Sequence, residues 1–144
     1  MQIIATPDLA VRLRLAITRT SRRLRQEAGT GLSPTLTAAL ATIDRHGPLT
    51  PSALAARERV QRPTATRLVA RLEELGVVQR AGAPADRRSS LLSVTPEGRA
   101  LLEEMRGRKT AYLAHRIEKL EPEERAALDR AAAILERLLE DERA

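Results

Sequence analysis

The sequence predicts a mainly α-helical fold with one small β-hairpin. In most segments, apolar residues recur at the spacing of an amphipathic helix. This period breaks between residues 77 and 94, where two short apolar runs flank a stretch rich in Gly, Pro, Asp and Ser, a pattern typical of a β-hairpin. With 144 residues, the chain has the length of a single small domain.

The first two predicted helices each begin at a hydroxyl residue that precedes proline. Thr6 is expected to cap the first helix, which Gly29 and Gly31 stop. Ser33 caps the second, which ends at the His-Gly-Pro run of residues 46–48. Such hydroxyls accept hydrogen bonds from the free N–H groups of the first turn, where proline is well tolerated.

The third and fourth predicted helices follow each other closely. Thr50 and a proline start a short helix over residues 52–59. A fourth helix is predicted over residues 62–75, with Gly76 as its C-cap. Its buried stripe is expected to consist of Ala65, Leu68, Val69, Leu72 and Leu75.

The strands of the hairpin are expected at residues 77–80 and 91–94, on either side of a tip at residues 81–90. Thr95 then repeats the cap-and-proline signal and opens a long helix. The acidic run at residues 121–124 opens the last helix, because carboxylates favour the positive end of a helix dipole.

This order of elements predicts a winged helix-turn-helix, in which a second helix enters the DNA major groove and a basic hairpin, the wing, lies beside it. The chain resembles the multiple-antibiotic-resistance regulator (MarR) family. Four stretches carry the resemblance: Leu49–Ala55, Thr66–Val78, Asp86–Arg88 and Val94–Arg99. The resemblance implies an N-terminal dimerisation helix in residues 1–32, a DNA-binding lobe in residues 33–98 and C-terminal dimerisation helices in residues 99–144.

The charge and the aromatic content narrow the choice of nucleic-acid partner. Lys and Arg number 25 against 19 Asp and Glu, a net charge of +6, and the excess lies in residues 1–28 and 57–108. Tyr112 is the sole aromatic residue. Single-strand binders and RNA-recognition sheets stack bases on several aromatic side chains, so both are poor candidates. Double-stranded DNA, bound through phosphates and groove edges, remains the expected partner.

Other functional classes are disfavoured by motifs that the chain lacks. The sequence has no Cys and two His that lie far apart, so we expect neither a metal nor a cofactor. It has none of the phosphate-binding, metalloprotease or serine-hydrolase motifs, and an enzyme is not expected. The absence of a leader-like start and of a long apolar run predicts a cytoplasmic protein without a membrane partner.

The polar side of the fourth helix carries the expected recognition residues, which are Arg62, Pro63, Thr64, Thr66, Arg67 and Arg71. On an arbitrary helix these would be ordinary solvated positions, but here the helix follows a helix-turn. Short side chains near its start allow close approach to base edges. We expect Arg62, Thr64, Thr66 and Arg67 at or near the bases, and Arg71 on phosphate.

The preceding turn departs from the family pattern. Where the family usually has an apolar residue and Gly, this chain has Glu58 and Arg59. Arg57 and Arg59 are therefore expected to add phosphate contacts at the turn.

The predicted wing tip carries Asp86, Arg87 and Arg88. Asp86 and Arg88 can form a surface ion pair, which by itself contributes little. The resemblance implies that the aspartate orients an arginine into the minor groove. Arg88 is favoured for insertion and Arg87 for phosphate, although either arginine fits the groove.

The resemblance also implies a homodimer and an effector cleft. Apolar stripes on the two terminal helices need a partner, which in this family is the second subunit. Family members often respond to small, frequently anionic aromatic molecules. The candidate cleft residues are Arg19, Arg23, His46, Tyr112 and His115.

We therefore expect a sequence-specific regulator that acts as a homodimer on a pseudopalindromic operator and is released by a small-molecule effector. A repressor is favoured over an activator, because blocking a promoter requires no contact with polymerase. The alternative is an architectural or ligand-independent winged-helix DNA-binding protein.

Overall fold

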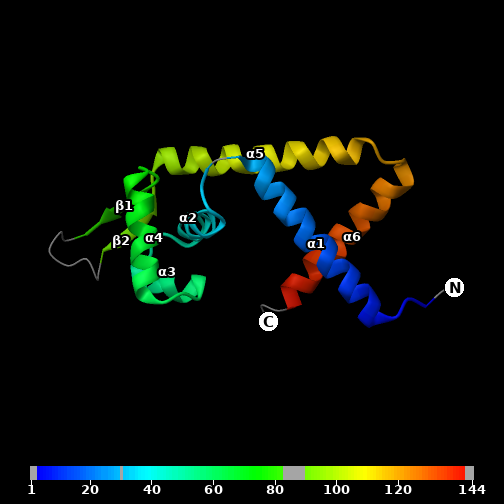
Figure 1. Cartoon of the computed structure of the whole chain (residues 1–144), viewed down its shortest axis with the longest axis horizontal. Coiled ribbons are helices and arrows are strands. Elements are labelled where there is room, and N and C mark those ends of the chain that lie inside the picture. Colours follow the sequence, from blue (N-terminus) through cyan, green and yellow to red (C-terminus); the bar gives the residue numbers. More distant parts are fainter. Residues whose placement is uncertain (1–2, 30, 83–89, 142–144) are drawn as a thin grey trace. The chain divides into compact units, whose positions relative to one another are not determined.

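The structure is a computed structural model that describes residues 3–29, 31–82 and 90–141. The elements follow the order α1 (Thr6–Ala28), α2 (Pro34–His46), α3 (Pro51–Glu58), α4 (Arg62–Glu74), β1 (Val78–Ala81), β2 (Leu91–Val94), α5 (Pro96–Glu118) and α6 (Pro122–Asp141) (Figure 1). The predicted mainly helical fold with one hairpin is confirmed. The chain forms two compact units, residues 1–109 and residues 110–144, whose boundary lies within α5.

The core of the first unit is built around α2. This helix packs against α3, α4 and β2, and α4 in turn packs against α3 and β1. The largest fully buried side chains are Leu40, Ile43, Leu54, Val69, Leu72 and Leu92. Burial of each such side chain contributes about 1.5–3 kcal/mol. The core therefore fixes α4 against the rest of the lobe.

Three of the four predicted hydroxyl caps are present. Ser33 Oγ accepts from Leu36 N at 3.2 Å, and Thr50 Oγ1 accepts from Ala53 N at 3.1 Å. Thr95 Oγ1 accepts from Gly98 N at 3.1 Å at the start of α5. The expected cap at Thr6 is wrong, because the helix begins one residue earlier and Ala5, in an extended conformation, is the N-cap.

The end of α4 turns the chain into the hairpin. Gly76 N donates to Glu73 O at 2.9 Å and Val77 N donates to Leu72 O at 3.1 Å, which is the bonding pattern of a Schellman motif. Gly76 adopts a φ of 74°, which an L side chain rarely tolerates. Leu75, expected in the buried stripe, lies beyond the last helical turn and is 40% exposed.

A third short segment pairs with the hairpin, and the sequence did not indicate this pairing. Strands β1 and β2 are antiparallel, with Val78 opposite Val94 and Arg80 opposite Leu92. Leu49, between α2 and α3, forms an isolated bridge to Leu92, with N–O distances of 3.1 and 2.7 Å. The bridge ties the start of the helix-turn-helix to the base of the hairpin.

The terminal helices leave their apolar side chains uncovered. No residue of α6 is buried, and Ala28 is the buried residue of α1. The exposed large apolar residues of these helices include Leu9, Val11, Leu15, Ile17, Leu128, Ile134, Leu138 and Leu139. Within the described ranges, no helix is long and apolar enough to cross a membrane.

Candidate nucleic-acid interface

The turn between α3 and α4 places one arginine in an unusual backbone conformation. Arg59 has φ 54° and ψ 44°, in the left-handed region, and Val60 N donates to Ala55 O at 3.0 Å. For a side chain with a Cβ this conformation costs about 1–2 kcal/mol. The resemblance places glycine at this position, and glycine adopts this conformation most easily, whereas the chain has Arg59 there.

The neighbouring Glu58 helps to hold this turn. The Thr42 hydroxyl on α2 donates to a carboxylate oxygen of Glu58, the last residue of α3. This partly buried bond fastens the end of α3 to α2. Arg57 and Arg59, the predicted phosphate contacts at the turn, are both exposed.

Helix α4 has one buried side and one cationic side. Ala65, Val69 and Leu72 are buried and hold the helix against the lobe. Of the six predicted recognition residues, Thr64 is half-buried and the other five are exposed: Arg62, Pro63, Thr66, Arg67 and Arg71. The structure thus brings these residues together on the outward side of a helix that the core keeps in place.

Polar contacts within α4 organise this cationic side. Arg67 Nη2 donates to Thr64 Oγ1 at 3.4 Å, and the Thr66 hydroxyl donates to Arg62 O at 3.0 Å. Arg71 Nη1 lies 3.1 Å from Glu74 Oε2. The first turn contains no acidic residue. The positive end of the helix dipole is therefore reinforced by Arg62 rather than neutralised, which favours an anionic partner.

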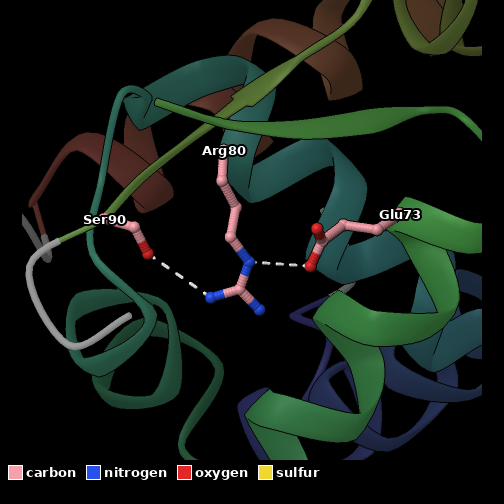
Figure 2. Close-up of polar contacts among 3 residues, drawn as sticks. All are labelled: Glu73, Arg80 and Ser90. Carbon is pink, nitrogen blue, oxygen red and sulfur yellow. Dashed lines mark hydrogen bonds and ion pairs between the residues drawn. The ribbon is translucent and has the colours of Figure 1, made fainter. Parts of the chain in front are cut away.

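The predicted wing residues Asp86, Arg87 and Arg88 lie outside the described residues. The two strands of the hairpin are described, and at their far end lies a cluster that the sequence did not indicate. Arg80 Nε donates to Glu73 Oε1 at 2.8 Å, and Arg80 Nη1 donates to Ser90 Oγ at 3.3 Å. Figure 2 shows the guanidinium between the carboxylate and the hydroxyl. Opposite charges on the two sides of the Gly76 turn were the signal that could have indicated this pair.

The five residues predicted for an effector cleft do not form one cluster within a unit. Arg19, Arg23 and His46 belong to the first unit, whereas Tyr112 and His115 belong to the second. Arg23 Nη2 forms an ion pair of 2.8 Å with Glu27 Oε1.

The first unit contains a cavity of about 320 Å³ near the C-terminal end of α1. None of the five predicted cleft residues lines it. The lining residues are Arg22, Arg25, Gln26, Ala28, Gly29, Gly31, Leu32, Pro34, Thr37, Met105 and Lys109. The cavity thus combines three cationic side chains with an apolar wall. In the described part of the chain, no three His, Asp or Glu residues gather closely enough to hold a metal ion.

The turn, the cationic side of α4 and the hairpin that follows it define a winged helix-turn-helix of the type that binds duplex DNA. A MarR family model matches residues 32–90. A Mycobacterium tuberculosis protein described as an HTH-type transcriptional regulator is 39% identical over 134 residues, which cover 92% of this chain and 94% of that protein. The chain belongs to the MarR family and is a DNA-binding transcription regulator.

Solved structures agree with this assignment. A crystal structure of a transcriptional regulator protein from Pseudomonas aeruginosa superposes with a TM-score of 0.81 at 36% identity, covering 92% of this chain and 95% of that one. A variant of Staphylococcus aureus MepR bound to an oligodeoxyribonucleotide superposes with a TM-score of 0.68 at 18% identity, covering 92% of this chain and 96% of that one. At this lower identity the likeness concerns the fold.

Proposed function

We propose that the protein is a homodimeric repressor that binds a pseudopalindromic operator in double-stranded DNA. In this proposal α4 enters the major groove and the hairpin lies at the adjacent minor groove. The observation that carries the proposal is the exposed arginine-rich side of α4, supported from behind by buried Ala65, Val69 and Leu72. A MepR variant of the same fold, solved bound to an oligodeoxyribonucleotide, supports DNA as the partner of this fold.

We assign different roles to the residues on and before α4. Arg62, Thr64, Thr66 and Arg67 read base edges, and the compact ring of Pro63 lets the helix start approach the groove. A bidentate arginine–guanine contact contributes about 1–3 kcal/mol of discrimination between bases. Arg57, Arg59 and Arg71 bind phosphates, which strengthens binding without selecting a sequence.

The wing assignment rests on the sequence. Asp86 orients an arginine toward the minor groove, where narrow A·T tracts have a strongly negative potential. Arg88 is the preferred inserted residue and Arg87 the preferred phosphate contact.

The homodimer follows from the uncovered apolar side chains of α1 and α6. Leu138 is 56% exposed and Leu139 is 63% exposed in the single chain. Monomeric proteins rarely expose large apolar patches, and each of the two terminal helices exposes several large apolar side chains. A twofold dimer that covers it places two copies of α4 about 34 Å apart, one helical turn of DNA.

The basic cavity supports a small anionic effector. Arg22, Arg25 and Lys109 supply charge, whereas Leu32, Pro34 and Met105 supply an apolar wall suited to an aromatic ring. A panel of aromatic carboxylates, titrated into the protein–DNA complex, tests this. Release of DNA that Arg25→Ala abolishes supports the effector, and no release by any member favours the ligand-independent alternative.

Selection of bound duplexes from a random DNA pool, followed by footprinting on the selected sequence, tests the proposed function. Recovery of an inverted repeat, protected in two half-sites one helical turn apart, is the expected result. Uniform protection of every fragment would instead support an architectural DNA-binding protein. Activation rather than loss of transcription from a promoter that overlaps the site would contradict the repressor role.

A further inference from the structure

We propose that Arg80 is a positioning residue that sets the orientation of the hairpin relative to α4 and thereby the contribution of the hairpin to DNA binding. The inference rests on the proposed function. It starts from one guanidinium that joins two elements: Arg80 on β1 donates to Glu73 on α4 at 2.8 Å and to Ser90, beside β2, at 3.3 Å. Figure 2 shows the three side chains meeting at this point.

The position of the cluster explains why it controls orientation. Arg80 lies one residue before the end of β1, and Ser90 lies one residue before the start of β2. The guanidinium therefore connects the two sides of the hairpin near the end of the sheet where Ala81 pairs with Leu91. Glu73 follows the buried Leu72 in the last turn of α4, so its backbone is held by the core. A planar guanidinium fork fixes direction as well as distance.

The surroundings distinguish this pair from the other ion pair of α4. The side chains of Arg80 and Glu73 are 22% and 34% exposed, whereas those of Arg71 and Glu74 are 57% and 67% exposed. Water and salt screen a partly buried pair less than an exposed one. The Glu73–Arg80 pair is thus the better suited of the two to hold one orientation.

A direct phosphate contact by Arg80 is the competing explanation. Removal of the Glu73 charge distinguishes the two explanations. If Arg80 binds phosphate, loss of the Glu73 charge releases the guanidinium and binding becomes tighter. If Arg80 positions the hairpin, loss of the same charge weakens binding, although the protein becomes more positive. The two explanations therefore predict changes of opposite sign.

The experiment measures the affinity of the full chain for its selected duplex by fluorescence anisotropy. We expect Glu73→Gln to weaken binding by about threefold or more, a coupling typical of residues within one hydrogen-bonded network. Glu74→Gln, one residue further along, removes the same charge from the exposed pair and is the matched control. Its affinity should stay unchanged or increase. Tighter binding by Glu73→Gln would overturn the proposal.

Arg80→Lys gives a second, independent readout. Lysine keeps the positive charge but lacks the planar fork, so we expect it to behave like Glu73→Gln; full affinity in Arg80→Lys would favour a phosphate contact and overturn the proposal. Hydroxyl-radical footprints of both variants should lose protection of the minor groove beside each half-site. Protection of guanine N7 from dimethyl sulfate, which reports the major groove contacted by α4, should be kept. Equal loss in both grooves in a variant whose urea denaturation is unchanged would also overturn it. Absence of any sequence preference in the unmodified chain would instead contradict the proposed function.

Discussion

Among single residues, Arg59 combines a strained backbone conformation with a proposed contact to DNA. Its left-handed conformation is one that glycine adopts at little cost. Strain that persists at one position is often retained for function. We infer that arginine is present at this position because of its side chain, since the conformation of the turn would favour glycine.

Replacement of Arg59 by glycine should separate stability from binding. We expect Arg59→Gly to raise the free energy of unfolding by about 1 kcal/mol, because the strain is relieved. DNA binding should weaken, and the slope of log K against log salt should become shallower by about 0.9, the contribution of one phosphate contact. Urea denaturation and anisotropy titrations over a salt series measure the two effects.

Arg57→Gly is the control for stability only, because Arg57 is itself a proposed phosphate contact; it lies two residues earlier, in the last turn of α3. There glycine should lower stability, by at most about 1 kcal/mol, because glycine disfavours the helical conformation. A loss of stability in Arg59→Gly would contradict the strain argument. An unchanged salt slope would remove Arg59 from the phosphate contacts.

Arg67 and Arg71 should differ in the kind of binding that they support. We expect Arg67→Ala to lose about 1–3 kcal/mol on the selected operator and to relax the preference at one base pair. Arg71→Ala should weaken binding to all sequences about equally. Affinities for the operator and for a shuffled duplex measure both effects, with Arg130→Ala on α6 as a control for the loss of one charge. Equal losses on both duplexes in Arg67→Ala would remove it from base reading.

At the level of elements, the join between the hairpin and α5 has no space for a side chain at Gly98. A Cβ there would overlap the carbonyl oxygen of Val77, and it would lie 2.8 Å from Val94 Cγ1. Thr95 closes the same join, because its hydroxyl donates to Gly76 O at 2.7 Å and accepts from Gly98 N at 3.1 Å. The first turn of α5 and the residue before β1 therefore pack backbone against backbone.

Gly98→Ala should consequently destabilise the protein by about 1–3 kcal/mol, the usual range for overpacking. Gly107→Ala is the matched control in the same helix, where a Cβ would meet nothing within 4 Å. That control should gain up to about 1 kcal/mol from helix propensity. Thermal and urea denaturation measure both changes, and a Gly98→Ala variant as stable as the unmodified chain would contradict the close packing at this join.

For the whole molecule, the uncovered apolar residues of α1 and α6 are the basis of the proposed homodimer. We expect sedimentation at micromolar concentration to give twice the chain mass of 15.8 kDa. Leu138→Glu should lower that mass toward the monomer, because a carboxylate at an apolar interface loses its water. DNA affinity should fall with it, since two half-sites bind more tightly when they are linked.

Leu75→Glu is the control for this change. Leu75 is also an exposed leucine, but it lies at the end of α4 rather than on a terminal helix. Its substitution should leave the sedimentation mass unchanged. A monomer mass for the unmodified chain would contradict the homodimer.

The sequence was sufficient to predict the order of the helices, the hairpin and the exposed side of α4. Proline, serine, threonine and glycine specify where a helix begins or ends through contacts a few residues away, and helical periodicity identifies the buried side. Thr6 was misassigned because a hydroxyl before proline fits either the cap or the first turn. The Arg57 and Arg59 assignments depended on charge and remain proposals.

Tertiary structure alone decided the features that join distant segments. The bridge between Leu49 and Leu92, the hydrogen bond from Thr42 to Glu58 and the cationic cavity between α1 and α2 depend on chain packing, for which no local pattern exists. The Arg80 cluster is of the same kind, because its three side chains come from α4, β1 and the residue before β2. By itself the sequence thus determined a winged helix with a basic helix facing outward, because these properties are local. The fold decided how the hairpin is held against that helix, because that requires the contacts of the folded chain.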